Sequence, residues 1–95
     1  MSDVFDALAH PVRRKILKLL RDGPLSAGDL AERFALAKPT LSGHFTVLKA
    51  ADLVATERRG TSIIYSLNMS VLEEAMAALM SIAGTEAPEP EGEPT

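Results

Sequence analysis

The spacing of the hydrophobic residues changes period along this chain, and that change restricts the possible folds more than any other feature. In the first half, apolar residues recur at the three- and four-residue spacing of amphipathic helices. From Ser62 to Leu67 they alternate, with Ile63, Tyr65 and Leu67 on one face, as in a strand. Helical spacing returns after Ser70. The sequence therefore predicts the order α-α-α-α-β-β-α, a mainly α-helical fold with a small β-hairpin.

Two capping boxes predict where the third and the last helix begin. In each box a serine is followed three residues later by an acid, so serine and acid can each accept a backbone N–H. The boxes are Ser26 with Asp29 and Ser70 with Glu73, and Leu25 is placed to pack on Leu30 as a hydrophobic staple.

The limits of the other elements come from turn residues and proline. The predicted elements are a helix from Val4 that stops before His10-Pro11, a helix from Pro11 that ends at Gly23-Pro24, a helix after Ser26 whose apolar face is Leu30, Ala31 and Phe34, a helix from Lys38 to Ala51, strands Val54–Arg58 and Ser62–Leu67 joined by Arg59-Gly60-Thr61, and a helix from Ser70.

Composition fits one small intracellular domain. The 95 residues include only four aromatic ones, so the core must be aliphatic. The absence of cysteine excludes structural disulfides and thiolate metal sites. No uncharged apolar run approaches the ~20 residues needed to cross a membrane, and the acidic start is unlike a secretory signal. We expect a soluble cytoplasmic protein with no membrane insertion.

The net charge of −3 is unevenly divided. Residues 84–95 contain four glutamates, three prolines and no basic residue, which predicts a disordered acidic tail. Residues 1–83 contain ten Lys or Arg against nine Asp or Glu, a net charge of +1, and form the predicted folded domain.

Two short helices separated by three residues, followed at once by a hairpin with a basic tip, are the arrangement of a winged helix-turn-helix. Such a helix fits the major groove of DNA, and the hairpin reaches the phosphates. The outward face of the helix 38–51 is small and polar without any acid, whereas a solvated face would usually include Glu or Asp. The predicted DNA-binding residues are Lys38, Pro39, Thr40, Ser42, Gly43, His44, Thr46 and Lys49 on this helix, and Arg58 and Arg59 on the hairpin 54–67.

Four segments in register resemble the ArsR/SmtB family of bacterial winged-helix repressors. They are AHPVRRKIL at 9–17, LAERF at 30–34, KPTLSGHFTVL at 38–48, and RRG at 58–60 with YSLN at 65–68, so that the resemblance covers roughly residues 3–83. Within the family the chain looks closest to the metal-independent SdpR-like autorepressors. The resemblance implies a homodimer joined through the first and last helices and bound to a double-stranded DNA operator with an inverted repeat. It also implies repression by occluding a promoter, on the nucleoid when bound.

Apolar residues that one small body cannot cover also predict a dimer. The predicted dimer-interface residues are Val4, Phe5, Leu8, Leu72, Met76, Leu79 and Met80. The stripe of Met76 and Met80 favours a core and dimer seam over a ligand pocket.

Three positions depart from the pattern of the family. Gly43 stands where members usually carry Arg, His or Gln, so one base-reading side chain is absent. Ala37 replaces the usual N-cap serine, and Asp52 replaces the glycine that usually ends the recognition helix. The metal sites of the family do not carry over, since the third helix has no thiol and the last has no histidine. We expect no metal and no cofactor.

Several basic residues allow a second interpretation. His44 either contacts DNA or is a structural histidine, and Arg58-Arg59 either contact phosphate or only discourage aggregation at a sheet edge. The acidic tail either solubilises the protein or competes with DNA for the basic face. The basic residues of the second helix are predicted to form a solvated face, with the alternative that one of them pairs with an acid or contacts a flanking phosphate; they are Arg13, Arg14, Lys15, Lys18 and Arg21.

The alternative class of function is a winged-helix protein-interaction module that does not bind DNA. Its signature would be acids or large apolar residues on the outer face of the helix 38–51, and that face has neither. An enzyme is not expected, because the sequence offers no nucleophile–base pair, no paired catalytic carboxylates and no phosphate-cradling glycine loop.

Overall fold

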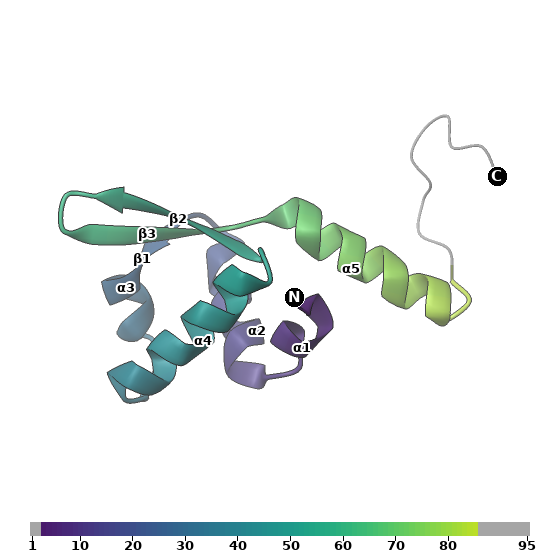
Figure 1. Ribbon diagram of the computed structural model, residues 1–95, viewed down its shortest axis with the longest axis horizontal. Helices are drawn as coiled ribbons and strands as arrows, with labels where there is room; N and C mark the ends of the chain where they lie inside the picture. The colour runs from purple at the N-terminus through teal and green to yellow at the C-terminus, as the bar shows by residue number, and fades with distance from the viewer. Residues whose placement is uncertain (1–2, 86–95) are drawn as a thin grey trace.

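Five helices and three strands make up the part of the chain that the structure describes. The computed structural model describes residues 3–85. In chain order the elements are α1 Val4–Leu8, α2 Pro11–Leu20, β1 Leu25–Ser26, α3 Ala27–Ala31, α4 Lys38–Ala50, β2 Val54–Arg59, β3 Ser62–Leu67 and α5 Met69–Ile82. The β2–β3 hairpin, here called the wing, and α5 project from opposite ends of a body formed by the other helices (Figure 1). The predicted mainly α-helical fold with a hairpin is confirmed, with one additional strand.

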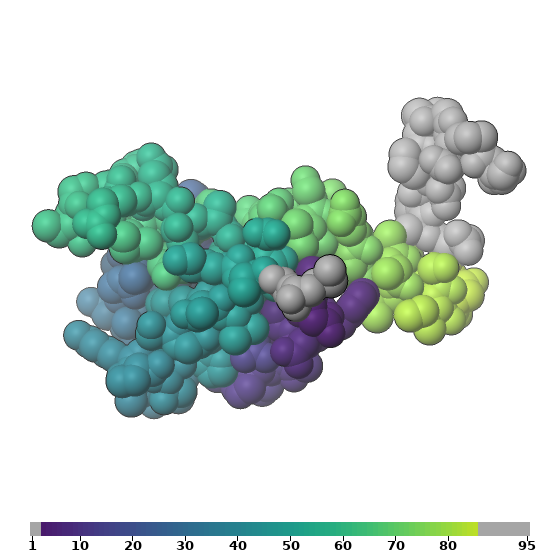
Figure 2. All heavy atoms as spheres, viewed as in Figure 1, coloured from purple at the N-terminus to yellow at the C-terminus, as the bar shows by residue number. Residues whose placement is uncertain are grey.

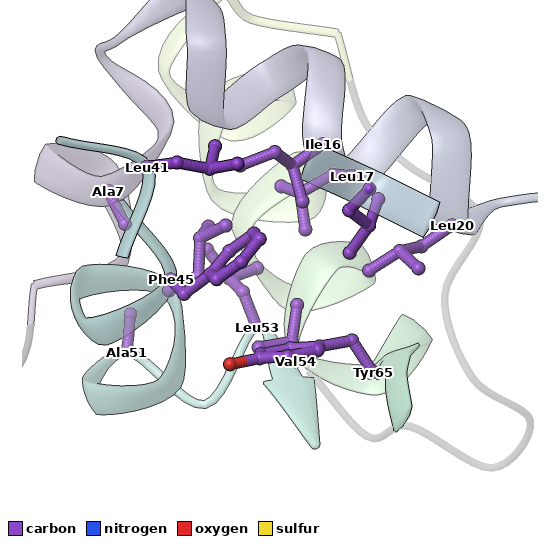
Figure 3. Close-up of a cluster of buried hydrophobic side chains, with 12 residues drawn as sticks. Ala7, Ile16, Leu17, Leu20, Leu41, Phe45, Ala51, Leu53, Val54 and Tyr65 are labelled. Carbon is purple, nitrogen blue, oxygen red and sulfur yellow. The ribbon is translucent and has the colours of Figure 1, made fainter. Parts of the chain in front are cut away.

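An aliphatic cluster holds α1 to α4 and the base of the wing together (Figure 3). The largest fully buried side chains are Ile16, Leu30, Leu48 and Leu53. Removing a side chain of this kind from water contributes about 1.5–3 kcal/mol. Phe45 of α4 contacts Tyr65 of β3, with ring centroids 4.7 Å apart. This contact attaches the wing to α4.

The sheet has three antiparallel strands in the order β1-β3-β2. Sequence reasoning missed β1, whose two residues are too few to show a period. Leu25 pairs with Tyr65 and Ser26 with Ile64. Leu25, which the sequence assigned to a staple on Leu30, is therefore a strand residue at the edge of the sheet.

The chain leaves α4 through a left-handed residue. Asp52 has φ 61°, and the N–H of Leu53 donates to the carbonyl of Leu48 at 3.0 Å. This is the hydrogen-bond pattern of a Schellman C-cap, which usually requires glycine. Aspartate fills that position here, since its short polar side chain tolerates the left-handed region.

Two predicted helix limits are wrong. The helix that was expected to include Phe34 ends at Ala31, and the N–H of Phe34 donates to the carbonyl of Ala31 at 3.2 Å in a tighter turn. The box of Ser70 and Glu73 does not start α5, because the helix already begins at Met69 after Asn68. The box of Ser26 and Asp29 is confirmed in one direction, since the N–H of Asp29 donates to the Ser26 hydroxyl at 3.0 Å.

The last turn of α5 closes on glycine. Gly84 has φ 79°, and the N–H of Thr85 donates to the carbonyl of Met80 at 2.9 Å. The predicted acidic tail lies, from residue 86 onward, outside the described residues. None of the described helices is long and apolar enough to cross a membrane.

Candidate nucleic-acid interface

The exposed face of α4 is the centre of the candidate interface. Leu41, Phe45 and Leu48 anchor the helix in the core by their regular spacing. The residues that point outward are small or basic, and none of the predicted DNA-binding residues of α4 is buried. Those exposed are Lys38, Pro39, Thr40, Ser42, Gly43, Thr46 and Lys49, whereas His44 is half-buried.

The N-terminus of α4 keeps donors available for an anion. Ala37 is the N-cap, and because its methyl side chain has no polar atom it makes no capping hydrogen bond. The backbone N–H groups of the first turn therefore have no capping partner. Together with the helix dipole and the side chain of Lys38, they favour a phosphate at this end of the helix.

The middle of α4 presents little side-chain bulk. A Cβ added at Gly43 would meet no heavy atom within 4 Å, so a side chain there would project into open space. The hydroxyl of Thr46 donates to the carbonyl of Ser42 at 3.0 Å, which leaves its oxygen free only to accept. The hydroxyl of Ser42 makes no hydrogen bond within the described chain and points outward as a free donor and acceptor.

The wing places its two arginines on opposite faces. Successive residues of a strand point to opposite sides, and Arg58 pairs across the hairpin with Ile63, while Arg59 pairs with Ser62. Arg58 therefore lies on the same face as Tyr65, which contacts α4. Arg59 lies on the other face with Glu57, and its guanidinium is 3.3 Å from the Glu57 carboxylate. The far end of the wing extends beyond the helical body (Figure 2). Both arginines are exposed.

His44 of α4 forms a cluster with Arg13 of α2 and with His10, the N-cap of α2. A terminal nitrogen of Arg13 lies 3.1 Å from Nδ1 of His44, and the ring of His10 lies 4.4 Å from the ring of His44. Burial, the neighbouring His10 and the charge of Arg13, in that order, hold the pKa of His44 below its ordinary value. The lowered pKa favours the neutral form of His44, and its Nδ1 is already engaged with a protein side chain.

The prediction that the five basic residues of α2 form a solvated face is wrong for one of them. Arg13 is half-buried, because it donates to the carbonyls of Asp6 and Ala7 as well as to His44. The other four are exposed, and Lys15 lies over the ring of Phe34 at 5.0 Å. The arginine at 13 could not be separated from its neighbours by sequence alone, since its partners come from two other helices.

A second surface, on α1 and α5, is apolar. Phe5 is 45% exposed, Met76 51% and Leu79 50%, while the other predicted dimer residues, Val4, Leu8, Leu72 and Met80, are half-buried. Sequence reasoning did not include Met69, which is 44% exposed, or Ile82, which is 82% exposed. No cluster of three or more potential metal ligands occurs within residues 3–85.

Comparisons with known proteins agree with this geometry. The profile of a helix-turn-helix domain matches residues 8–57. The transcriptional repressor SdpR of Bacillus subtilis is 46% identical over 76 residues, which is 80% of this chain and 84% of that protein. The arsenical resistance operon repressor of Staphylococcus xylosus is 40% identical over 73 residues, 77% of this chain and 70% of its own.

A solved structure is similar in fold and sequence. The ArsR-like transcriptional regulator from Rhodococcus sp. RHA1 superposes with a TM-score of 0.77 at 30% identity, over 85% of this chain and 74% of its own. The similarity in fold therefore extends over most of the chain.

Proposed function

The chain belongs to the ArsR/SmtB-type family of winged helix-turn-helix repressors, which are DNA-binding regulators and not enzymes, and from this premise we propose how it binds DNA. Two copies form a homodimer, each places α4 in the major groove of one half of an inverted repeat, and each wing contacts phosphates. The bound dimer represses transcription by occluding promoters, and the promoter of its own gene is one of them. We place the protein in the cytoplasm, on the nucleoid when it is bound to an operator.

The exposed, acid-free face of α4 is the observation that carries this proposal. It gives hydroxyl and ammonium groups for base edges and free amide N–H groups for a phosphate. From residue 33 to residue 68 the chain has five basic residues and two acids, an excess of three positive charges on the elements that would lie against DNA. The alternative of an interaction module without DNA binding is not supported, because the relatives are named repressors.

The apolar surface of α1 and α5 supports the homodimer. Because α5 extends away from the body (Figure 1), half-exposed residues such as Met76 and Leu79 have no cover within the described chain. A second copy that brings the same surface would bury both sets about a two-fold axis. The same axis would relate the two copies of α4, as an inverted repeat requires.

We also propose that repression does not depend on a metal ion. The third helix has no cysteine, and α5 carries Glu73 and Glu74 without a histidine. Titration of Zn²⁺, Ni²⁺ or Cu²⁺ into the protein–DNA complex should leave the affinity unchanged. A tenfold loss at one metal per protomer would contradict this proposal.

A DNA-binding assay at two salt concentrations tests the proposed function. The labelled duplex is the DNA upstream of the coding region of this protein, and a shuffled duplex of the same length is the control. Specific binding should exceed binding to the shuffled duplex by about a thousandfold or more. Both affinities should fall steeply as the salt concentration rises. Equal affinity for the two duplexes would contradict an autorepressor.

A further inference from the structure

We propose that Arg13 is a positioning residue for the recognition helix: it fixes α4 against α1 through the unprotonated Nδ1 of His44, so that protonation of His44 releases α4 and weakens DNA binding. The proposal rests on the proposed function, because it takes α4 as the element that reads DNA.

The guanidinium of Arg13 uses its three nitrogens on two other helices. Its Nε donates to the carbonyl of Ala7 at 2.7 Å and one terminal nitrogen donates to the carbonyl of Asp6 at 3.0 Å. These carbonyls lie in the last turn of α1, where the carbonyl of Asp6 also accepts from the N–H of Ala9 at 3.1 Å and the carbonyl of Ala7 has no donor within the helix. The other terminal nitrogen donates to Nδ1 of His44 at 3.1 Å. One planar group on α2 therefore fixes the end of α1 and the middle of α4 relative to each other.

The hydrogen bond from Arg13 defines the state of His44. A guanidinium has only donors, so Nδ1 of His44 must be an acceptor and the ring proton must be on Nε2. Protonation would place an N–H where Arg13 already directs one, and would set two positive charges about 3 Å apart. The link between α1 and α4 therefore exists only while His44 is neutral.

The groups around His44 oppose its protonation. From α2 and its N-cap, Arg13 and His10 face the ring, and from α1 comes Asp6, whose carbonyl holds Arg13. On α4 itself the charged residues are Lys38 and Lys49, six and five positions away. Burial first, then the neighbouring His10 and the charge of Arg13, hold the pKa of His44 below its ordinary value, so that acid is needed to break the link.

The proposal predicts a pH effect of a definite sign. If His44 contacted a phosphate directly, protonation would add a positive charge and strengthen DNA binding. If His44 is the acceptor for Arg13, protonation removes the positioning of α4 and weakens binding. The direction of the change on acidification therefore distinguishes the two roles.

The experiment measures the affinity for a duplex selected by the wild-type protein from random DNA, at constant ionic strength, at about pH 8 and about pH 5.5. The wild type should lose about tenfold in affinity at the lower pH. His44→Asn should lose little, because the amide oxygen can accept from Arg13 and does not titrate. His10→Asn should still show the loss, since Asn preserves the N-cap of α2, where Nδ1 of His10 now accepts from the N–H of Val12.

Two arginine variants form a matched pair. Arg13→Lys retains the charge but cannot reach three acceptors, so it should bind about tenfold more weakly at pH 8 and show little further loss in acid. Arg14→Lys should behave as wild type in both respects, because Arg14 donates to the carbonyl of Leu8 on α1 and makes no hydrogen bond to α4 within the described residues. The ring ¹⁵N signals of His44, recorded without DNA, should show Nδ1 unprotonated at pH 8.

The possible outcomes separate the two proposals. A wild-type protein that selects no duplex contradicts the proposed function. A wild-type protein that binds its duplex more tightly in acid, or a His44→Asn variant that retains the full loss, contradicts the role of Arg13 and leaves the proposed function standing. A proton on Nδ1 of His44 at pH 8 contradicts it equally.

Discussion

Adjacent arginines in a strand cannot share one environment. Arg59 is paired with Glu57 on one face of the wing, whereas Arg58 has no ion pair within the described residues and lies on the face that contacts α4. An exposed pair such as Arg59 with Glu57 contributes only about 0.2–1 kcal/mol, so a phosphate can replace Glu57 at small cost. Both arginines can contact phosphate, but only Arg59 would have to break an ion pair with Glu57 to do so.

Arg58→Ala should therefore weaken DNA binding more than Arg59→Ala. Each substitution should affect specific and random DNA almost equally, because phosphates carry no base identity. Each should also reduce the salt dependence by roughly one unit per lost contact, or about two for a symmetric dimer. Anisotropy titrations at several salt concentrations measure both quantities. Loss of sequence preference in Arg58→Ala would show that the wing contacts bases instead.

The residues of α4 that are proposed to read bases should respond in the opposite way. Ser42→Ala should cost ~1–3 kcal/mol on specific DNA and leave random DNA nearly unaffected. Gly43→Arg should add a guanidinium that can donate two hydrogen bonds to a guanine edge, and should therefore change the half-site selected from random DNA. The open space at Gly43 allows this change without displacing a neighbour. Gly43→Ala is the control, since it should stabilise α4 by ~1 kcal/mol and leave the preferred half-site unchanged.

The lowered pKa of His44 also predicts how stability depends on pH. Because the folded protein holds this histidine neutral, the unfolded chain binds more protons between the folded pKa and the ordinary value of about 6.5. The stabilisation is therefore present above the ordinary pKa of about 6.5 and is lost as the pH falls from there through the lower pKa of the folded protein. Urea unfolding across this range should show a steeper loss of stability in the wild type than in His44→Asn. A wild-type protein that becomes more stable on acidification would contradict the assignment.

At the scale of single elements, the two serine boxes give a direct comparison. Ser26 caps α3 through its hydroxyl, whereas Ser70 lies exposed inside the first turn of α5 and caps nothing. Ser26→Ala should cost about 1 kcal/mol of unfolding free energy, and Ser70→Ala should change it by less than about 0.5 kcal/mol. Urea denaturation of the two variants measures the difference. Equal losses would show that the second box acts in the folded protein after all.

Elements whose evidence is local could be predicted from the sequence, and those that depend on distant contacts could not. The face of Leu41, Phe45 and Leu48 repeats within α4 itself, so this helix and its outward residues were predicted nearly to the residue. The start of α5 was not, because the N–H of Asn68 donates to the carbonyl of Leu53 at 2.9 Å and so fixes where the chain enters the helix. The same holds for β1, which exists only as a partner of β3.

The candidate site divides in the same way. Exposure along α4 follows from helical periodicity, so the polar residues expected to face DNA are found on its surface. The role of Arg13 follows from the packing of three helices, and no spacing in the sequence distinguishes it from the exposed Arg14. The pairing of Arg59 with Glu57 could have been found, since residues two apart in a strand share a face.

At the scale of the whole molecule, the polar interface and the apolar surface lie on different parts of the chain and depend on one another. The face of α4 and the wing form the interface proposed for DNA, while α1 and the projecting α5 form the surface proposed for the second copy (Figure 1). In the proposed dimer each protomer supplies only the base contacts of one α4, so high affinity for the operator depends on two copies of α4 held at a fixed spacing. Arg13 contacts both regions, since it links α1 to α4.

Leu79→Asp should therefore abolish dimerisation and operator binding together. Leu79 is half-exposed on α5, so the folded protomer can accept a charge there, whereas a dimer seam would have to bury it. Analytical ultracentrifugation at tens of micromolar should show a dimer for the wild type and a monomer for the variant. Ser81→Asp, which places the same charge on the side of α5 away from Leu79, should remain a dimer and bind DNA as the wild type does. A monomeric wild type, or a Leu79→Asp variant that still binds the operator tightly, would show that one copy of α4 and one wing suffice for recognition.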